Sequence, residues 1–521
     1  MAHVIIGPDE AHTLAPNDCG CSEHHHVARP GPDGVVCNDC GSASDQLWNG
    51  GFALPQRAAV AATPLHPHPR LHTLPLSDGY AAAFVPSLSR IAVLDRAAIA
   101  LLRRLPLAPH TCDPAERQAL TALTRAGLLS ADAAPTLPRP PPATTLVAWL
   151  HVTNACNLRC SYCYIDKRRA TMTLATARAT VDMLIASARR HGFPTLLIKY
   201  AGGEPTLQLS LIAATQRYAQ QQAAAHGISL RGGVLSNGTL ITSETARILH
   251  DLDLSLMVSL DGLAAINDAQ RVTSGGRPSF ERVRTGIDQA RAAGLQPTVS
   301  ITVTGQSIGG LPELVAWLLD AGLPFGVNFY REHPDSASRR ELQLDEQQLI
   351  AGMRAAYAVI ARRPPPWSLL ASLLDRADLS CSHSHACAAG QNYLVIDHAG
   401  RVTSCQMRLD QPVTTIGVQD PLSRVRAADG VLRNPSVDDR YGCRGCDWRY
   451  WCGGGCPAVT YQSTGRYEVT SPHCRIYREL IPEVVRLEGL RLLHWFGPRV
   501  IPPAPAAAYR RRGPGRHGRR R

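Results

Sequence analysis

The run Cys156-Asn-Leu-Arg-Cys160-Ser-Tyr-Cys163 follows an apolar stretch, Leu146–Val152, that we expect to form a buried strand. Three thiolates this close in sequence can bind one corner of a 4Fe–4S cluster, whereas a closed cluster takes four cysteines. The fourth iron would then stay open to a small molecule, as in catalytic metal sites that keep one position free. The alternative is a zinc site or scattered buried thiols, although zinc sites usually close with four ligands from paired short spacings.

Length and cysteine content bound the class of protein. The chain has 521 residues and 16 cysteines, which is enough for several domains and a large core. No run of about 18 uncharged apolar residues occurs, so we expect no transmembrane helix. The N-terminus lacks the basic start and long apolar stretch of a signal peptide. Many cysteines in a long chain without such a signal indicate metal or cluster ligands, so we expect a cytoplasmic protein with no membrane partner.

Positive charge is concentrated at the C-terminus. The net charge is +12, and seven arginines lie in Tyr509–Arg521. We expect residues 502–521 to form a basic disordered tail, because this segment is rich in Arg, Gly and Pro. The tail could contact RNA, an acidic partner or a membrane surface, or it could simply be solvated.

Changes in composition divide the rest of the chain into regions. Residues 1–55 are rich in Cys, His and Gly, and residues 70–132 have the pattern of a small α+β domain. A proline-rich linker at 135–142 should be extended and semi-rigid. After it we expect alternating strands and helices, then a helical bridge, then a second cysteine-rich region, at 144–335, 344–376 and 381–474.

The region 144–335 has the pattern of a parallel α/β fold. Helical periodicity at 173–191, 209–226, 280–294 and 311–322 separates short apolar runs, and this alternation predicts a parallel sheet. Ligands of such sheets bind at the carboxyl ends of the strands. The six predicted strands are Leu146–Val152, Thr195–Tyr200, Leu230–Ser236, Ser255–Leu260, Thr298–Val303 and Phe325–Phe329.

Polar motifs follow three of these strands where they end. Gly202-Gly203-Glu204-Pro205 follows the second strand, and its glycines would let the backbone approach a ligand closely. Ser236-Asn237-Gly238-Thr239 closes the third strand, and Ser259-Leu260-Asp261-Gly262 closes the fourth. Each motif could also be ordinary turn chemistry, but together they predict a ligand site at one edge of the sheet.

The cysteine spacing, with Tyr162 before the third cysteine, resembles the radical S-adenosylmethionine (SAM) superfamily, and the Gly-Gly-Glu-Pro motif is a second match. The resemblance implies an α/β fold with a partial (β/α)6 barrel. It implies that Cys156, Cys160 and Cys163 hold a 4Fe–4S cluster whose open iron binds SAM. Cleavage of SAM would give a 5′-deoxyadenosyl radical that abstracts a hydrogen atom. The residues expected to contact SAM are Tyr162, Gly202, Gly203, Glu204, Pro205, Ser259 and Arg271; no catalytic base is assigned.

The C-terminal cysteines resemble those of a SPASM domain, which carries two auxiliary 4Fe–4S clusters. The matching pattern is Cys387, Cys405, then Cys443-x2-Cys446-x5-Cys452-x3-Cys456, then Cys474. The resemblance implies one cluster on Cys381, Cys387, Cys405 and Cys456, and another on Cys443, Cys446, Cys452 and Cys474. If Cys381 is not a ligand, the first auxiliary cluster has an open iron. A zinc ribbon is the alternative for the 443–456 group.

One residue departs from the anaerobic sulfatase maturases. In those enzymes an Asp follows the cysteine that corresponds to Cys405 and takes a proton while Cys or Ser becomes formylglycine. Here the residue is Gln406, which cannot act as a base. We therefore expect another reaction of the SPASM group, such as a thioether or carbon–carbon crosslink in a ribosomally made peptide or protein.

Residues 70–132 predict two strands followed by two helices. Tyr80–Val85 and Arg90–Leu94 have the pattern of a hairpin, and Asp95 and Asp113 are suitable helix N-caps. The order is similar to the small winged-helix peptide-recognition element of such maturases, which binds a leader peptide by strand addition. A generic winged helix or a DNA reader is the alternative, but no Lys/Arg-rich recognition helix occurs, so nucleic acid is not expected as a partner.

The sequence thus predicts a radical SAM/SPASM peptide or protein maturase with three 4Fe–4S clusters and SAM, reduced by a partner such as ferredoxin or flavodoxin. A sulfatase-maturase-like oxidase of Cys or Ser is one alternative. An iron–sulfur electron carrier or a cysteine-rich nucleic-acid module is another. A zinc site in the N-terminal region is a further candidate, with ligands Cys19, Cys21, Cys37 and Cys40.

Overall fold

The computed structural model describes residues 63–497 except 87, 89, 134, 136–139, 334–338 and 429–431, together with three short N-terminal strands at 4–6, 28–31 and 34–37. The expected basic tail at 502–521 lies outside these residues, as do Cys19, Cys21 and Cys40 of the N-terminal zinc candidate. Cys37 ends the short strand β3 (Gly34–Cys37), of which the backbone is described.

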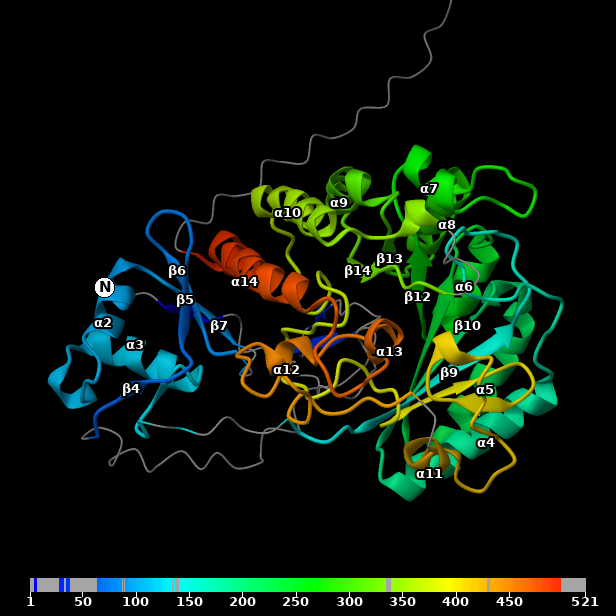
Figure 1. Cartoon of the computed structure of the whole chain (residues 1–521), viewed down its shortest axis with the longest axis horizontal. Helices are drawn as coiled ribbons and strands as arrows, with labels where there is room; N and C mark the ends of the chain where they lie inside the picture. The colour runs from blue at the N-terminus through cyan, green and yellow to red at the C-terminus, as the bar shows by residue number, and fades with distance from the viewer. Residues whose placement is uncertain are drawn as a thin grey trace, which may run out of the picture.

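The centre of the molecule is a nine-stranded sheet (Figure 1). Six of its strands are consecutive along the chain, pair in parallel and confirm the predicted α/β core. They are β9 (Thr145–Thr153), β10 (Thr195–Gly202), β11 (Ser229–Ser236), β12 (Leu254–Ser259), β13 (Thr298–Val303) and β14 (Phe325–Phe329).

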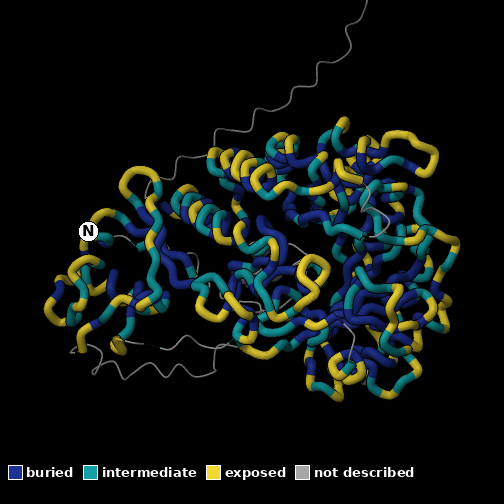
Figure 2. The backbone as a smooth tube through the Cα atoms, in the orientation of Figure 1, coloured by how far each residue is buried: buried dark blue, intermediate teal, exposed yellow. Residues whose placement is uncertain are grey.

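Both faces of this sheet are buried, as the near-continuous apolar composition of its strands requires. Leu196 and Ile198 of β10 pack into the main core with the helices, whereas Leu197 and Ala201 face the other way and pack near Tyr393. Figure 2 shows the buried positions concentrated along the sheet. The helices between the strands are α4 (Leu174–His191), α5 (Leu209–Ala225), α6 (Ser243–Asp251), α7 (Ala264–Gln270), α8 (Phe280–Ala292) and α9 (Leu311–Asp320).

The C-terminal cysteine-rich region continues the same sheet. Strand β15 (Tyr393–Ile396) pairs in parallel with β9, with Val395 opposite Trp149, and β16 (Arg401–Thr403) and β17 (Thr414–Thr415) follow antiparallel. The sequence pattern did not predict this extension. The helices of this half are α10 (Glu346–Arg362), α11 (Pro421–Ala427), α12 (Arg449–Cys452), α13 (Pro457–Thr464) and α14 (Cys474–Phe496).

The N-terminal part contains the predicted hairpin and the two predicted helices. The hairpin is β6 (Ala81–Phe84) and β7 (Ile91–Leu94), and the helices are α2 (Arg96–Arg103) and α3 (Pro114–Arg125). As expected from the sequence, Asp95 Oδ1 accepts from the Ala98 N–H at 2.7 Å, and Asp113 and Glu116 form a reciprocal capping box.

Two further strands complete this N-terminal sheet. Strand β5 (His72–Pro75) pairs with β6, and β1 (Val4–Ile6) pairs antiparallel with β7, so the order is β1-β7-β6-β5. One face packs on α2 and α3, and the other packs on α14 (Figure 1). Gly489 allows this contact, because a Cβ there would lie 3.1 Å from the Ala82 Cβ. Within the described residues, no helix is both long and apolar enough to cross a lipid bilayer.

Candidate functional site

The three-cysteine loop leaves the carboxyl end of β9 and is fixed by backbone hydrogen bonds. The Arg159 N–H donates to Val272 O at 2.8 Å, and the Ser161 N–H donates to Gln270 O at 2.9 Å. Leu158, between the first two cysteines, is fully buried and anchors the loop in the protein. The loop is therefore held in place by the segment that follows α7, and its cysteines stay partly exposed.

The thiols of this loop have the donor chemistry of a cluster site. Burial raises the pKa of Cys156, and it raises the pKa of Cys160 to about 11, with Cys163 adding to both shifts. The Leu158 N–H donates to Cys156 Sγ at 3.4 Å, and Asn237 Nδ2 lies 3.9 Å from the same sulfur. Three closely spaced thiols, one of which has N–H donors directed at its sulfur, suit an iron–sulfur cluster, whose potential such donors tune.

Glu204 links the second and third strands beneath this loop. Its side chain is fully buried, and burial raises the pKa of its carboxyl group. Oε1 accepts from the Thr206 N–H at 3.1 Å, from the Thr206 hydroxyl at 2.5 Å and from the Ser236 hydroxyl at 2.8 Å. Oε2 accepts from the Asn237 N–H at 2.7 Å. Each carboxylate oxygen has about two lone-pair positions, so Oε2, which accepts one hydrogen bond, keeps capacity for one further donor.

The glycines of the Gly-Gly-Glu-Pro motif serve the cysteine loop directly. A Cβ on Gly202 would lie 2.4 Å from Thr153 O, and one on Gly203 would lie 2.2 Å from Ala155 O. The sequence led us to expect that these glycines allow a ligand to approach closely. In the structure they allow β10 to approach the backbone that leads from β9 into the cysteine loop. Pro205, also buried, follows as the start of a short 3-10 turn.

Tyr162 and Arg271 meet at a third residue, Asp261. The Tyr162 hydroxyl donates to Asp261 Oδ2 at 2.5 Å, and Arg271 Nη1 contacts both side chains. Asp261 Oδ1 accepts from the Thr302 N–H at 2.8 Å. The structure thus brings together two of the expected SAM contacts, with burial raising the pKa of Tyr162. Ser259, the other expected contact on this side, ends β12 and is partly exposed.

Sequence reasoning did not assign Asp261 or Asn237 to the site, although both lie in the strand-end motifs. Asn237 Nδ2 donates to Asn157 Oδ1 at 2.8 Å, and Asn157 Nδ2 donates to the Thr239 hydroxyl at 2.8 Å. This amide chain joins the third strand to the cysteine loop. The signal available in the sequence was the position of both residues directly after a buried strand.

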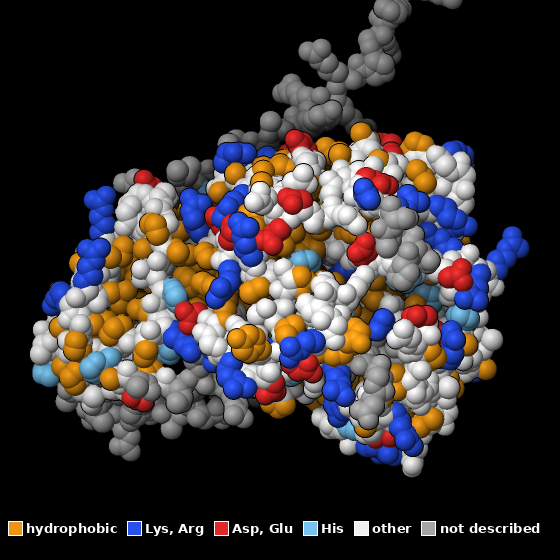
Figure 3. All heavy atoms as spheres, viewed as in Figure 1, with side chains coloured by type: hydrophobic (Ala, Val, Ile, Leu, Met, Phe, Trp, Pro, Cys, Tyr) orange, Lys and Arg blue, Asp and Glu red, His pale blue; other side chains and the backbone are white. Residues whose placement is uncertain are grey.

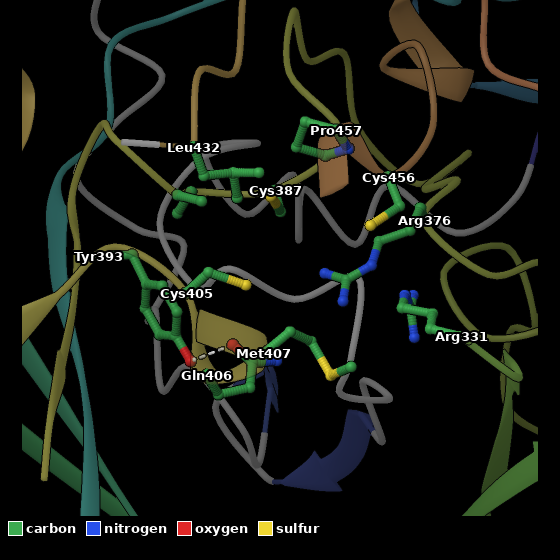
Figure 4. A pocket seen from close by; sticks show the side chains of 12 residues that line it. Arg331, Arg376, Cys387, Tyr393, Cys405, Gln406, Met407, Leu432, Cys456 and Pro457 are labelled. Atoms are coloured by element: carbon green, nitrogen blue, oxygen red, sulfur yellow. Dashed lines mark hydrogen bonds between the residues drawn. The ribbon is translucent and has the colours of Figure 1, made fainter. Parts of the chain in front are cut away.

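Three of the C-terminal cysteines line one cavity. Figure 4 shows the sulfur atoms of Cys387, Cys405 and Cys456 pointing into the same cavity, with Arg331 and Arg376 on the side of Cys456. This convergence fits the first predicted auxiliary set. Cys381 is buried, does not line the cavity, and its thiol donates to Asp378 Oδ2 at 3.2 Å. Its place as a fourth ligand therefore stays a prediction.

Gln406 is held as a hydrogen-bond acceptor next to this cavity. Its side chain is buried, and the Tyr393 hydroxyl donates to Gln406 Oε1 at 3.1 Å (Figure 4). The amide replaces the acid that the resemblance would place there, and the bond from Tyr393 fixes its orientation. This position offers no carboxylate to accept a proton.

The cysteines of the second predicted auxiliary set influence one another electrostatically. Burial raises the pKa of Cys452, and Cys443, Cys474 and Cys446 raise it further. Cys474 is the first residue of α14, whose N-terminus carries a positive partial charge. An anionic cluster would be stabilised at this helix end.

A run of three glycines separates the two auxiliary sets. Gly453, Gly454 and Gly455 have φ values of 60°, 84° and 71°, all in the left-handed region. This turn directs Cys452 to one set and Cys456, four residues later, to the other. The glycines between the last two cysteines of the C-x2-C-x5-C-x3-C pattern were the sequence signal for it.

Comparison with known proteins agrees with this geometry. Residues 150–322 match the radical SAM superfamily. The Fe-coproporphyrin III synthase of Methanosarcina barkeri is 28% identical over 221 residues, which cover 42% of this chain and 51% of that protein. The serine-type anaerobic sulfatase-maturating enzyme of Klebsiella aerogenes is 23% identical over 342 residues, which cover 63% of this chain and 83% of that enzyme.

Among solved structures, native anSMEcpe with bound AdoMet and the Cp18Cys peptide aligns with a TM-score of 0.54 and 18% identity, over 67% of this chain and 99% of that chain. This similarity shows a shared fold. The chain spans only 58%, 51% and 50% of the length of the first curated relatives that it matches. The match at 150–322, which contains the three-cysteine loop and the Gly-Gly-Glu-Pro turn, and the homology to anaerobic sulfatase-maturating enzymes identify this part of the chain as a radical SAM domain.

Proposed function

We propose that the chain is a radical SAM enzyme that modifies a ribosomally made peptide or protein, with a thioether or carbon–carbon crosslink as the product. The observation that carries this proposal is the three-cysteine loop at the carboxyl edge of the parallel sheet, supported by the cavity that Cys387, Cys405 and Cys456 line and by the cysteines around Cys452. Three 4Fe–4S clusters would occupy these cysteine sets.

The residues of the first site have distinct roles in this proposal. Cys156, Cys160 and Cys163 hold a 4Fe–4S cluster, and the remaining acceptor capacity of Glu204 Oε2 suits the ammonium group of SAM. When bound, the cluster and SAM would supply radical chemistry for hydrogen-atom abstraction from the substrate. Arg271 and Tyr162, joined through Asp261, present polar groups at the same edge of the sheet. A low-potential reductant such as ferredoxin or flavodoxin would deliver the electrons in the cytoplasm.

The N-terminal part is the proposed peptide-recognition module. Its four-stranded sheet has edges at β1 and β5, and an extended peptide can add to a sheet edge through backbone hydrogen bonds. The module lies against the second cysteine set, since the ring centroids of Phe84 and Trp451 are 5.7 Å apart. On the face shown in Figure 3, hydrophobic side chains gather over this module, which suits a peptide with apolar residues at alternate positions.

Deleting residues 1–134 tests the recognition role. We expect SAM cleavage without peptide to persist, and modification of full-length peptide to fall at least about tenfold, which corresponds to about 1.4 kcal/mol of affinity. Because the deletion also uncovers one face of α14, iron content measured on the same preparation is the control. Normal peptide modification by the truncated protein, with its iron intact, would refute the recognition role.

The sulfatase-maturase-like oxidase is the second candidate, because the Klebsiella relative is a serine-type sulfatase-maturating enzyme. Gln406 argues against it. The deciding experiment incubates reconstituted, reduced protein with SAM and either a sulfatase-type Cys or Ser peptide or short peptides encoded near the gene. Mass spectrometry then distinguishes an aldehyde from a crosslink. An aldehyde product would favour the oxidase, and a protein that never cleaves SAM would be an electron carrier.

Iron analysis tests the number of clusters. Eleven cysteines are assigned to three cubane clusters, so anaerobically reconstituted protein should hold about twelve irons. About four irons with bound zinc would replace the auxiliary clusters with a zinc ribbon. We also propose that the N-terminal cysteines hold zinc. The same metal analysis tests this, because zinc found in addition to about twelve irons would occupy that site.

A further inference from the structure

Arg440 is a buried cation without a carboxylate partner. Its side chain is 1% exposed and is among the largest fully buried side chains of the described residues. Its donors reach neutral oxygens: Nη1 donates to Gly454 O at 2.8 Å, Nη2 to Asn434 Oδ1 at 3.2 Å, and Nε to Pro435 O at 3.2 Å. Within the described part of the chain, no carboxylate lies within ion-pair distance of it. A buried charge of this kind requires an opposite charge nearby.

Cysteines of both auxiliary sets lie near Arg440. Burial lowers the pKa of the Arg440 guanidinium, and Cys443, Cys387, Cys452 and Cys456 partly oppose this shift. Two of these thiols belong to the first set and two to the second.

Hydrogen bonds place Arg440 between the two sets independently. Gly454 lies in the glycine turn between Cys452 and Cys456, and a Cβ on it would lie 2.9 Å from Arg440 Nη1. Asn434, which accepts from Arg440, donates through Nδ2 to Cys387 O at 2.6 Å and lies 3.7 Å from Cys387 Sγ. The guanidinium thus donates to the backbone between Cys452 and Cys456, and it is linked to Cys387 through the side-chain amide of Asn434.

The other arginines at the first auxiliary set differ in this respect. Arg331 makes a two-fold contact with Asp375, at 2.8 Å and 2.9 Å, and Arg376 Nε lies 3.9 Å from the same carboxylate. Their charge is already partly balanced by an acid. Arg440 makes no such ion pair with a carboxylate of the described residues, and the cysteines of both sets favour its charge.

We infer that Arg440 is the shared counter-charge of the two auxiliary clusters and raises the reduction potential of both. The inference rests on the proposed function to the extent that both cysteine sets hold 4Fe–4S clusters. An electron added to a four-thiolate cluster increases its negative charge, and a nearby buried cation stabilises that reduced form. Because Arg440 lies between both sets, it also lowers the repulsion between the two clusters when each carries an added electron.

The test is a redox titration of Arg440→Gln, followed by low-temperature EPR. A background in which Cys156, Cys160 and Cys163 are Ala leaves the auxiliary signals alone. We expect both auxiliary potentials to fall by at least about 59 mV, a tenfold change in a one-electron equilibrium. The matched control is Arg444→Gln, which removes the same charge from the same cysteine run. Arg444 is exposed and donates to Asp438 O, so water screens its charge, and the shift should be much smaller.

Each outcome decides something. Unchanged potentials in Arg440→Gln, or a shift of only one cluster, would overturn the shared role. If Arg440→Gln loses auxiliary iron, Arg440→Lys keeps the charge while losing the guanidinium geometry: recovered iron and potential support the inference, and equal loss in the Lys variant overturns it. Wild-type protein with only about four irons would overturn the proposed function as well, whereas about twelve irons with an unshifted Gln variant overturns this inference alone.

Discussion

The two cysteine regions of this molecule reach similar chemistry by different structural routes. The first is one contiguous run after β9, held against the segment at 270–274 by backbone hydrogen bonds. The second collects thiols from positions between 387 and 474, and a left-handed glycine turn and a buried arginine bonded to that turn lie among them. A contiguous motif depends on one loop, whereas the dispersed sets depend on many long-range contacts.

The difference also concerns charge. The first loop keeps its cysteines partly exposed at the edge of the sheet, where a small molecule can approach. In the second region Cys381, Cys443 and Cys456 are buried and the other five cysteines are partly exposed, and the buried cation Arg440 lies among them. The two regions therefore differ in this buried charge more than in the exposure of their thiols.

Replacing the three cysteines of the first loop with Ala should have the largest effect, because it should remove the function of the first region and leave the second region intact. We expect 5′-deoxyadenosine formation to be abolished while about eight irons remain on the auxiliary sets. Chromatography of SAM products and iron analysis are the measurements. Undiminished SAM cleavage by the triple variant would show that the first loop is not the reactive centre.

Gly453→Ala tests whether the glycine turn positions the cysteines of the second region. The position has a φ of 60°, and a Cβ would lie 2.6 Å from the Ala386 N. We expect a loss of about 2 kcal/mol in the free energy of unfolding, part from the left-handed backbone and part from the clash. Auxiliary iron should fall while SAM-cluster iron stays.

The matched control for this variant is Gly465→Ala, which has a φ of 68° but open space around the new Cβ. It should show the backbone strain alone, at about 1 kcal/mol. Equal effects of the two substitutions on iron binding would mean that the turn does not position the cysteines.

Cys381→Ala sharpens the assignment of the first auxiliary set. Following the family resemblance, we expect the EPR signal of that cluster to change and its iron to be partly lost, with the second set unaffected. Asp378→Asn, which keeps an acceptor for the Cys381 thiol, is the companion variant. Identical iron and EPR in Cys381→Ala would leave this thiol as a buried hydrogen-bond donor outside the cluster.

The smallest effect concerns the contact between the two halves at Asp420. Burial raises its pKa, but hydrogen bonds from His191 and from Ser423 outweigh this and lower the pKa to about 2. An acid with a depressed folded-state pKa stabilises the protein above its unfolded pKa of 3.8, and this contribution is lost as pH falls from there toward about 2.

Asp420→Asn should therefore lower stability at pH 7 by about 1 kcal/mol, after allowance for solvent screening, and should flatten the acid limb of the stability curve. Denaturant unfolding at several pH values measures both. A variant that keeps the wild-type pH dependence would show that Asp420 does not carry this contribution.

The features that the sequence predicted are those encoded locally. The six strands, the cysteine loop and the Asp95 and Asp113 caps each follow from a few neighbouring residues, through periodicity, spacing and side-chain reach. The similarity to peptide and protein maturases came from the cysteine spacing, which is also a local pattern.

The features that were missed depend on contacts between distant segments. The pairing of β15 with β9 brings Tyr393–Ile396 beside residues near 150, and no local pattern records that neighbour. Asp261 and Asn237 were visible as strand-end residues, but their partners Tyr162 and Glu204 lie on other elements. Arg440 gives no sign in the sequence that it will be buried.

Strand β1 has a consequence for how this molecule meets other chains. Without β1, the edge of β7 would expose a row of backbone N–H and C=O groups that could pair with a strand of another chain and cause aggregation. Val4–Ile6 occupies that edge, with Val4 packed toward the α2–α3 side and Ile5 toward α14. The protein thus covers the edge of β7 with its own sequence. A peptide that adds to this sheet, as proposed above, would pair with β5 or β1, and it could pair with β7 only after displacing residues 4–6.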